Sequence, residues 1–123
     1  MIIALLGILL GMFVGLLLPL SFTTAYSLYV SVAILAAVDS VFGAIRSSMQ
    51  DQFEPVIFVT GFVSNAVLAA VLAYIGDNLG VPLYYAAIFA FGVRLFNNLA
   101  IIRRIFIEKV RDYLKTRKKI KKT

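Results

Sequence analysis

Few side chains in the apolar stretches of this sequence could do chemistry, and they fall at similar depths. The segment FGVRLFNNLAIIRR, residues 91–104, places Arg94, Asn97 and Asn98 in an otherwise apolar run. Asp39 and Asn65 interrupt two earlier apolar runs. If these runs cross a membrane, Arg94 and Asp39 each lie about 12 residues from the same side, which at about 1.5 Å per residue places them within a turn of one another.

A charge at this depth is expected to find a partner. An isolated Arg at the centre of a bilayer costs about 2.5–3.5 kcal/mol on insertion scales, so such residues normally face a bundle interior and pair. We predict an Asp39–Arg94 ion pair, with the amides of Asn65, Asn97 and Asn98 satisfying the remaining donors and acceptors. Such a pair would fix helix register. The alternative is that the five residues line an ion or proton path, which is less favoured because one acid matched by one base leaves no free titrating group.

Small residues predict where helices touch one another. Ala86 and Ala90 precede Arg94 at helical spacing, so we expect one stripe of the helix to carry alanines and polar residues together. Similar pairs occur at Ala33/Ala37 and Ala69/Ala73. The segment GILLGMFVG spaces its glycines four apart, which is typical of a close helix contact. This seam, which either packs within one chain or meets a second copy or a partner, comprises Gly7, Gly11 and Gly15.

Membrane helices are the elements expected to carry these residues. The 123-residue chain is 62% hydrophobic and only 15% charged, too apolar for a soluble domain of its size. About 20 helical residues span the roughly 30 Å hydrocarbon core, so each apolar run of that length predicts one span. We expect an all-α, antiparallel bundle of four transmembrane helices, followed by a basic, partly helical tail over residues 103–123. The expected spans are about 2–18, ended by Pro19, then 27–46, 55–75 and 82–102.

Lys and Arg set the expected orientation. Residues 103–123 hold ten Lys or Arg and two acidic residues, whereas the loops at 19–26 and 76–81 hold no Lys or Arg. By the positive-inside rule, we expect the tail and the loop after Arg46 to be cytoplasmic. The chain is therefore expected to be a multi-pass plasma-membrane protein with both termini in the cytoplasm. The first apolar run lacks a basic n-region and a good cleavage site, so a retained helix is favoured over a signal peptide.

The tail is amphipathic as well as basic. Ile107, Val110 and Leu114 recur at helical spacing, so we expect the fourth helix to continue along the membrane surface. Basic residues beside a membrane gain about 1 kcal/mol each from anionic lipid. Nucleic-acid binding is not expected, because no stacking platform or base-reading fold accompanies the basic run. The residues expected to contact anionic lipid are Arg103, Arg104, Lys109, Arg111, Lys115, Arg117, Lys118 and Lys119.

Catalysis has little support in the sequence. The chain has no Cys and no His, so it lacks thiolate nucleophiles, imidazole bases and the usual zinc or haem ligands. Asp51, Glu54 and Asp77 fall in loops that are too short to shape a pocket, and no nucleophile–base arrangement is evident. We therefore expect no enzyme activity, no cofactor and no metal.

Three segments carry a resemblance to a known family. AILAAVDSVFGAIRSSM, GFVSNAVLAAVLAYIGDNLGV and LYYAAIFAFGVRLFNNLAIIRR contain the motifs Asp-Ser-x-Phe-Gly, Gly-Asp-x-x-Gly and Asn-Leu-Ala-Ile-Ile-Arg-Arg, in that order. Over roughly residues 28–105 the chain resembles the small basic protein family of Gram-positive and related bacteria. The resemblance implies a bacterial membrane protein without an assigned biochemical activity, often encoded near cell-division and envelope genes. It also implies recurrent polar positions at Asp39, Asn65, Asp77, Arg94, Asn98 and Arg103.

These features favour a small integral membrane scaffold or accessory subunit that acts through helix–helix contacts and its polybasic tail. The resemblance would link it to cell division or envelope assembly. The expected partners are lipids with anionic headgroups and either further copies of the chain or another membrane protein. The alternative is an oligomeric channel or small transporter, in which Asp39, Arg94 and the asparagines line an ion path. A dual-topology transporter is disfavoured because Lys and Arg are strongly biased to one side.

Overall fold

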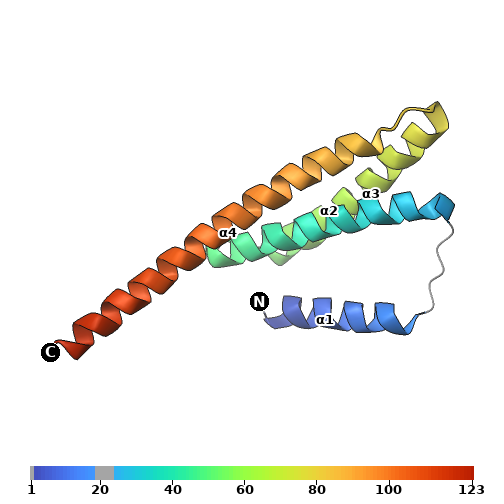
Figure 1. Cartoon of the computed structure of the whole chain (residues 1–123). Coiled ribbons are helices and arrows are strands. Elements are labelled where there is room, and N and C mark those ends of the chain that lie inside the picture. The colour runs from blue at the N-terminus through green and yellow to red at the C-terminus, as the bar shows by residue number, and fades with distance from the viewer. Residues whose placement is uncertain (1, 19–23) are drawn as a thin grey trace.

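The computed structural model describes residues 2–18 and 24–123, which include four α-helices (Figure 1). In chain order these are α1 (Ile2–Leu17), α2 (Thr24–Met49), α3 (Pro55–Leu79) and α4 (Tyr84–Lys121). The predicted all-helical class is confirmed. Within the described residues, α2, α3 and α4 are long and apolar enough to cross a membrane, whereas α1 is a shorter apolar helix.

Helix α2 continues past its expected end. Arg46 lies inside the helix, which runs on to Met49 before the chain reverses. The backbone N–H of Gln50 still donates to the carbonyl of Arg46 at 3.1 Å, and Asp51 then adopts a φ of 56°. Helix α3 begins at Pro55 as predicted, because the missing N–H of proline costs nothing in the first helical turn. The end of the bundle that carries this turn is called the Gln50 end below.

The opposite turn, between α3 and α4, is held by two glycines. Gly80 ends α3 in the left-handed conformation, with a φ of 68°, and the N–H of Val81 donates to the carbonyl of Gly76 at 2.9 Å. A Cβ added to Gly76 would lie 2.5 Å from the carbonyl oxygen of Val81 and 2.8 Å from the Cβ of Leu83. The turn can therefore fold this tightly only with glycine at position 76. This end of the bundle is called the Gly80 end.

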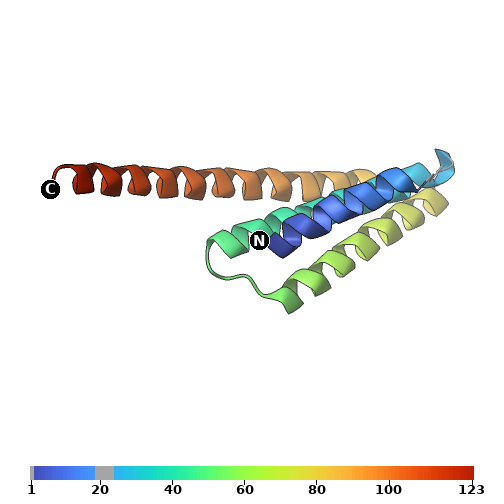
Figure 2. The same ribbon diagram turned by 90° about the horizontal axis from the view of Figure 1, so that it is seen from below.

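The core of the bundle is built mainly from small side chains and lies toward the Gly80 end. Close approach of this kind is how helices associate in lipid, where burying apolar surface provides little drive. Figure 2 shows α3 and α4 close together at the Gly80 end and diverging toward the Gln50 end. The buried hydrophobic residues are Val32, Ala36, Ala69, Ala73, Ala87 and Phe91.

The predicted alanine stripe of α4 is wrong by one position. Ala86 and Ala90 are exposed, whereas Ala87 and Phe91 are buried against α2 and α3. The prediction centred the contact face on Arg94, but a long Arg side chain can reach around its helix, so its Cα need not face the neighbour. In α3, by contrast, the expected pair Ala69 and Ala73 is fully buried.

Helix α1 stands apart from the other three. None of its described Cα atoms comes within 8 Å of a Cα atom in α2, α3 or α4, and most of its side chains are exposed. The packed bundle of the described residues therefore contains three helices, where the sequence predicted four. Figure 1 shows α1 running alongside α2. Pro19, which was expected to end this helix, lies outside the described residues.

Helix α4 continues without interruption through the expected boundary at residues 102–103. Its 38 residues correspond to about 57 Å of helix, nearly twice the thickness of a bilayer core. Figures 1 and 2 show its C-terminal half projecting in a straight line beyond the other helices. The tail is therefore helical almost to its end, and it follows the axis of α4 without the bend that would lay it along a membrane surface.

Candidate functional site

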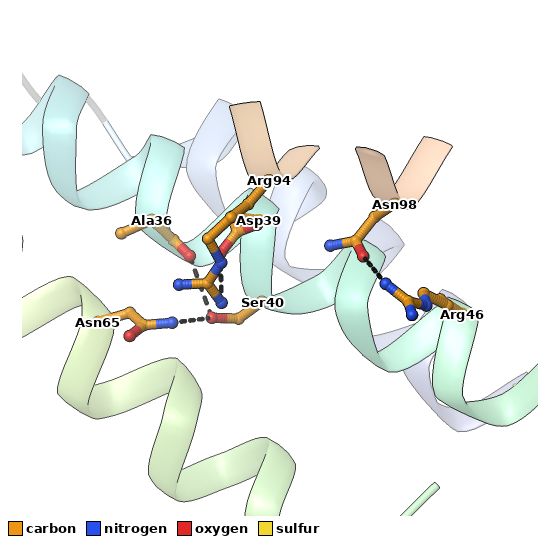
Figure 3. A network of polar contacts seen from close by, with 7 residues as sticks. All are labelled: Ala36, Asp39, Ser40, Arg46, Asn65, Arg94 and Asn98. Atoms are coloured by element: carbon orange, nitrogen blue, oxygen red, sulfur yellow. Dashed lines mark hydrogen bonds and ion pairs between the residues drawn. The ribbon is translucent and has the colours of Figure 1, made fainter. Parts of the chain in front are cut away.

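An ion pair between α2 and α4 forms the centre of the polar site (Figure 3). Arg94 Nη2 lies 3.0 Å from Oδ2 of Asp39. The carboxylate is fully buried, whereas the Arg94 side chain is 55% exposed. Neither oxygen of Asp39 accepts a hydrogen bond of good geometry from the described residues, so its contact with Arg94 is chiefly electrostatic. The Arg94 guanidinium also lies 5.7 Å from the ring centroid of Phe91, one turn earlier on α4.

Helix α3 reaches this centre through an amide and a hydroxyl. Asn65 Nδ2 donates to Ser40 Oγ at 3.2 Å, and Ser40 Oγ donates to the backbone carbonyl of Ala36 at 3.1 Å. Ser40 follows Asp39 directly, so Asn65 lies beside the ion pair without joining it, as Figure 3 shows. The role predicted for Asn65, as a partner of the pair itself, is therefore replaced by a contact with the neighbouring residue.

A second polar contact between α2 and α4 lies nearer the Gln50 end. Arg46 Nη1 donates to Asn98 Oδ1 at 3.2 Å, and the buried Asn98 packs over Gly43, with 3.7 Å between its Nδ2 and the position of a Cβ on that glycine. Asn98 thus accepts a hydrogen bond from Arg46 and does not contact the Asp39–Arg94 pair through a hydrogen bond, which corrects the prediction. Asn98 lies one helical turn beyond Arg94 on α4, and the packing of the two helices places its side chain beside Arg46 and Gly43 of α2.

Arg46 and Gly43 were missed as site residues, although their spacing gives a signal. Asp39, Gly43 and Arg46 follow one another at i, i+4 and i+7, which places them on a single face of α2. The place of Arg46 at the end of an apolar run predicts only the cytoplasmic end of that helix. Asn97 was included in the predicted cluster, but it is exposed and makes no hydrogen bond to the described residues.

Arg46 and Arg94 both line a polar groove of about 410 Å³ between α2 and α4. Its lining has no acidic side chain, so the two guanidinium groups are surrounded by amides and a hydroxyl. Asp39 lies beneath Arg94 and belongs to the neighbouring cavity. The lining residues of the polar groove are Gly43, Arg46, Ser47, Gln50, Gln52, Arg94, Asn97 and Asn98.

The polar groove continues into an apolar one. A connecting cavity of about 240 Å³ shares Ala44 and three phenylalanines with the apolar groove beyond. It shares four residues with the polar groove: Gly43, Ser47, Gln52 and Arg94. The apolar groove has a volume of about 640 Å³ and lies between α1, α2 and α3. Successive ring centroids along its wall, from Phe53 to Phe58 and from Phe58 to Phe62, are 5.9 Å apart.

The other predicted sites are exposed in the part of the chain that the structure describes. A Cβ added at Gly11 or Gly15 would meet no atom within 4 Å; the same holds at Gly7, although Gly7 lines the apolar groove. Packing within one chain is therefore not the use of this glycine face in the described residues. The basic residues of the tail are exposed from Arg103 onward. Among the described residues, no group of three or more acidic side chains could hold a metal ion.

Comparison with known proteins identifies the family. Residues 22–107 match the family described as "Protein of unknown function (DUF1290)". The chain belongs to this family. It is also 46% identical over 57 residues to a protein of Bacillus subtilis (strain 168) named "Small basic protein". The resemblance to small basic proteins is thus confirmed, and the family match covers α2, α3 and the membrane-length part of α4.

The family match leaves out α1 and most of the basic tail. The alignment with the Bacillus subtilis protein covers 46% of this chain and 47% of that protein, so the chain spans about half the length of this relative. No solved structure matches the chain. The matched region contains both polar contacts between α2 and α4, Asp39–Arg94 and Arg46–Asn98.

Proposed function

We propose that this protein is a small integral membrane scaffold or accessory subunit that carries a basic helix from the membrane into the cytoplasm. The observation that supports this most directly is the unbroken helix α4, Tyr84–Lys121. About 20 of its residues suffice to cross the bilayer, which leaves a helix of about 27 Å beyond the hydrocarbon core. In the proposed topology both termini are cytoplasmic, and the Lys and Arg bias supports this orientation.

The projecting helix offers a docking surface of defined chemistry. Ile107, Val110 and Leu114 form an exposed apolar stripe with the 3–4 spacing of a coiled-coil seam, and basic residues flank them. A second copy of this helix would bring ten more Lys or Arg against the first, which is unfavourable. An acidic amphipathic helix on a cytoplasmic protein matches both the apolar stripe and the charge.

A straight α4 also changes the proposed lipid contacts. Arg103 and Arg104 lie close to the membrane surface, but Lys115 is about 18 Å beyond Arg103 along the helix. The attraction between a cation and anionic lipid falls off within a Debye length of about 8–10 Å at physiological salt. The distal basic residues are therefore assigned to a protein partner and the proximal ones to lipid headgroups.

A gentle-detergent purification of the tagged full-length protein from its own membranes tests the proposal. We expect a reproducible partner set, among which division or envelope proteins would support the link implied by the family resemblance. Leu114→Ser should release a partner bound at the apolar stripe, whereas Thr116→Ser, on the opposite side of the helix, should retain it. Gly11→Leu should release a membrane partner held at the glycine face of α1. If Leu114→Ser and Gly11→Leu both retain every partner, the proposal is contradicted.

The alternative is an oligomeric channel or small transporter, and one observation favours it. Arg94 and Asn97 are exposed in the single chain, so copies arranged in a ring could direct them toward a shared path. This alternative predicts a homo-oligomer without a foreign partner. It also predicts anion flux in reconstituted liposomes that is lost in Arg94→Gln and kept in Lys122→Gln.

A further inference from the structure

The polar groove contains more positive charge and more hydrogen-bond donors than the chain itself uses. An arginine side chain has five N–H donors. Arg94 directs Nη2 toward Asp39, and more than half of its side chain remains exposed. Arg46 donates one hydrogen bond, to Asn98, and forms no ion pair with the described residues. Two guanidinium groups thus face one groove, and only one of them is matched by a carboxylate.

The exposed part of Arg94 is the clearest sign that something else occupies the groove. In the proposed topology this guanidinium lies within the bilayer, where an uncovered cation is costly. Asp39 holds it from beneath and so orients its remaining donors toward the groove. Gln50 and Asn97 add amide donors at the groove wall. A ligand that satisfies this set must be an anion with several acceptor oxygens.

Phosphate meets this requirement better than a single carboxylate. The planar fork of arginine matches two phosphate oxygens at once, and a phosphate has enough oxygens for two arginines and an amide. Asp39 and Glu54 line the connecting cavity, and Asp51 lies in the turn between Gln50 and Gln52, but none of these three acids lines the polar groove. An anion is therefore favoured in the polar groove beside Arg46 and disfavoured in the connecting cavity.

The apolar groove indicates that the phosphate belongs to a lipid. It is reached from the polar groove through the connecting cavity, and phenylalanine rings at 5.9 Å spacing form its wall. A free phosphate would leave this path unused, whereas an acyl chain would fill it. Arg46 lies near the proposed cytoplasmic surface of the bilayer, where a lipid headgroup resides.

We propose that the polar groove binds the phosphate group of an anionic lipid through Arg46 and Arg94, with an acyl chain in the apolar groove. Asp39 is then a positioning residue for Arg94. This site lies within the membrane domain, and it goes beyond the proposed contacts of the basic tail. A negative result at the lipid site can be distinguished from a negative result for the scaffold proposal. The lipid site is tested at Arg46, which is remote from the apolar stripe of the projecting helix.

Lipid titration of the purified full-length protein, read by native mass spectrometry, tests the site. The probes are dioleoyl phosphatidic acid, dioleoylglycerol with the same chains but no phosphate, and inorganic phosphate. We expect one phosphatidic acid per chain, with either other probe at least about tenfold weaker. Arg46→Gln should weaken phosphatidic acid binding by about tenfold or more, the usual effect of losing a charged hydrogen-bond donor. Lys122→Gln removes the same charge from the tail and should stay within about twofold.

A second variant tests the groove without changing any charge. Gly43→Leu places a side chain in the groove beside Asn98, where a Cβ alone would make an ordinary 3.7 Å contact. We expect the same loss of phosphatidic acid binding, with helical circular dichroism and monodispersity unchanged. Equal weakening by Arg46→Gln and Lys122→Gln, or full binding by folded Gly43→Leu, would overturn the site. Inorganic phosphate binding as tightly as phosphatidic acid would overturn the lipid assignment and make free phosphate the ligand.

Discussion

The two ends of the bundle are built on opposite principles. At the Gly80 end, alanines and Gly76 bring the backbones of α2, α3 and α4 close together, and a cavity of about 270 Å³ lies beside the turn. At the Gln50 end the helices diverge, and polar side chains bridge α2 to α4 across open grooves. Close packing of small residues holds helix backbones together, whereas polar contacts between separated helices leave room for a ligand. The difference predicts which substitutions destabilise the fold and which alter the site.

The largest effect is expected from breaking the ion pair that lies between the two ends. Arg94→Gln leaves the fully buried carboxylate of Asp39 without a cation, which should cost about 3 kcal/mol of unfolding free energy. Unfolding by SDS in mixed micelles, followed by circular dichroism, measures it. The double variant Asp39→Asn with Arg94→Gln removes both charges and should recover most of the loss.

The charge swap provides the stricter test of this pair. Asp39→Arg combined with Arg94→Asp should be more stable than either single substitution, because each single substitution places like charges together. If the swapped protein is no more stable than the single variants, the two residues do not stabilise each other.

The next largest effect is expected at the Gly80 end. Gly76→Ala forces a Cβ to within 2.5 Å of a backbone oxygen that cannot move without opening the turn, so we expect a loss of about 2 kcal/mol. Gly61→Ala, on the same helix, is the matched control because a Cβ there meets no atom within 4 Å. It should be neutral, or stabilising by up to about 1 kcal/mol through helix propensity. Similar losses in both variants would show that the turn is not tightly packed.

A smaller effect is expected at the Gln50 end. Asn98→Ala removes the acceptor of the Arg46 hydrogen bond, which should cost about 1.5 kcal/mol. The neighbouring Asn97→Ala is the control, and it should stay within about 0.5 kcal/mol because Asn97 is exposed and makes no hydrogen bond to the described residues. Equal effects would mean that the two asparagines are not distinguished by burial, contrary to the groove geometry described above.

The sequence predicts the membrane-length helices well because their signal is local. Long apolar runs, a first-turn proline and turn glycines each act within a few residues, so α3 begins at Pro55 as predicted. The pairing of Asp39 with Arg94 can also be predicted from the sequence, because the depth of a residue in a membrane helix follows from counting residues. The rotation of a helix about its axis is harder to predict, because two neighbouring faces of α4 are offset by only one residue in the sequence. The contact face therefore includes Ala87 and not Ala86.

The missing parts of the site arise from geometry that no local pattern encodes. Whether Asn98 serves Asp39 or Arg46 depends on how α2 and α4 cross, and both choices satisfy the same spacing. The divergence of the helices at the Gln50 end, which creates the grooves, likewise depends on the packing of all three helices. The position of α1 depends least on the other three helices, because none of its described Cα atoms comes within 8 Å of theirs and most of its apolar side chains are exposed.

The smallest predicted effect tests whether the Gly80 end is held by packing alone. Tyr29 donates to Asp77 Oδ2 at 2.6 Å, linking α2 to α3 beside the turn. This contact is exposed and water can replace it, so Tyr29→Phe should cost only about 0.5 kcal/mol in the same unfolding measurement. Tyr26→Phe, an exposed tyrosine one turn earlier, should have no effect. A loss for Tyr29→Phe as large as that for Gly76→Ala would mean that a polar contact also governs this end, and the contrast between the two ends would then not hold.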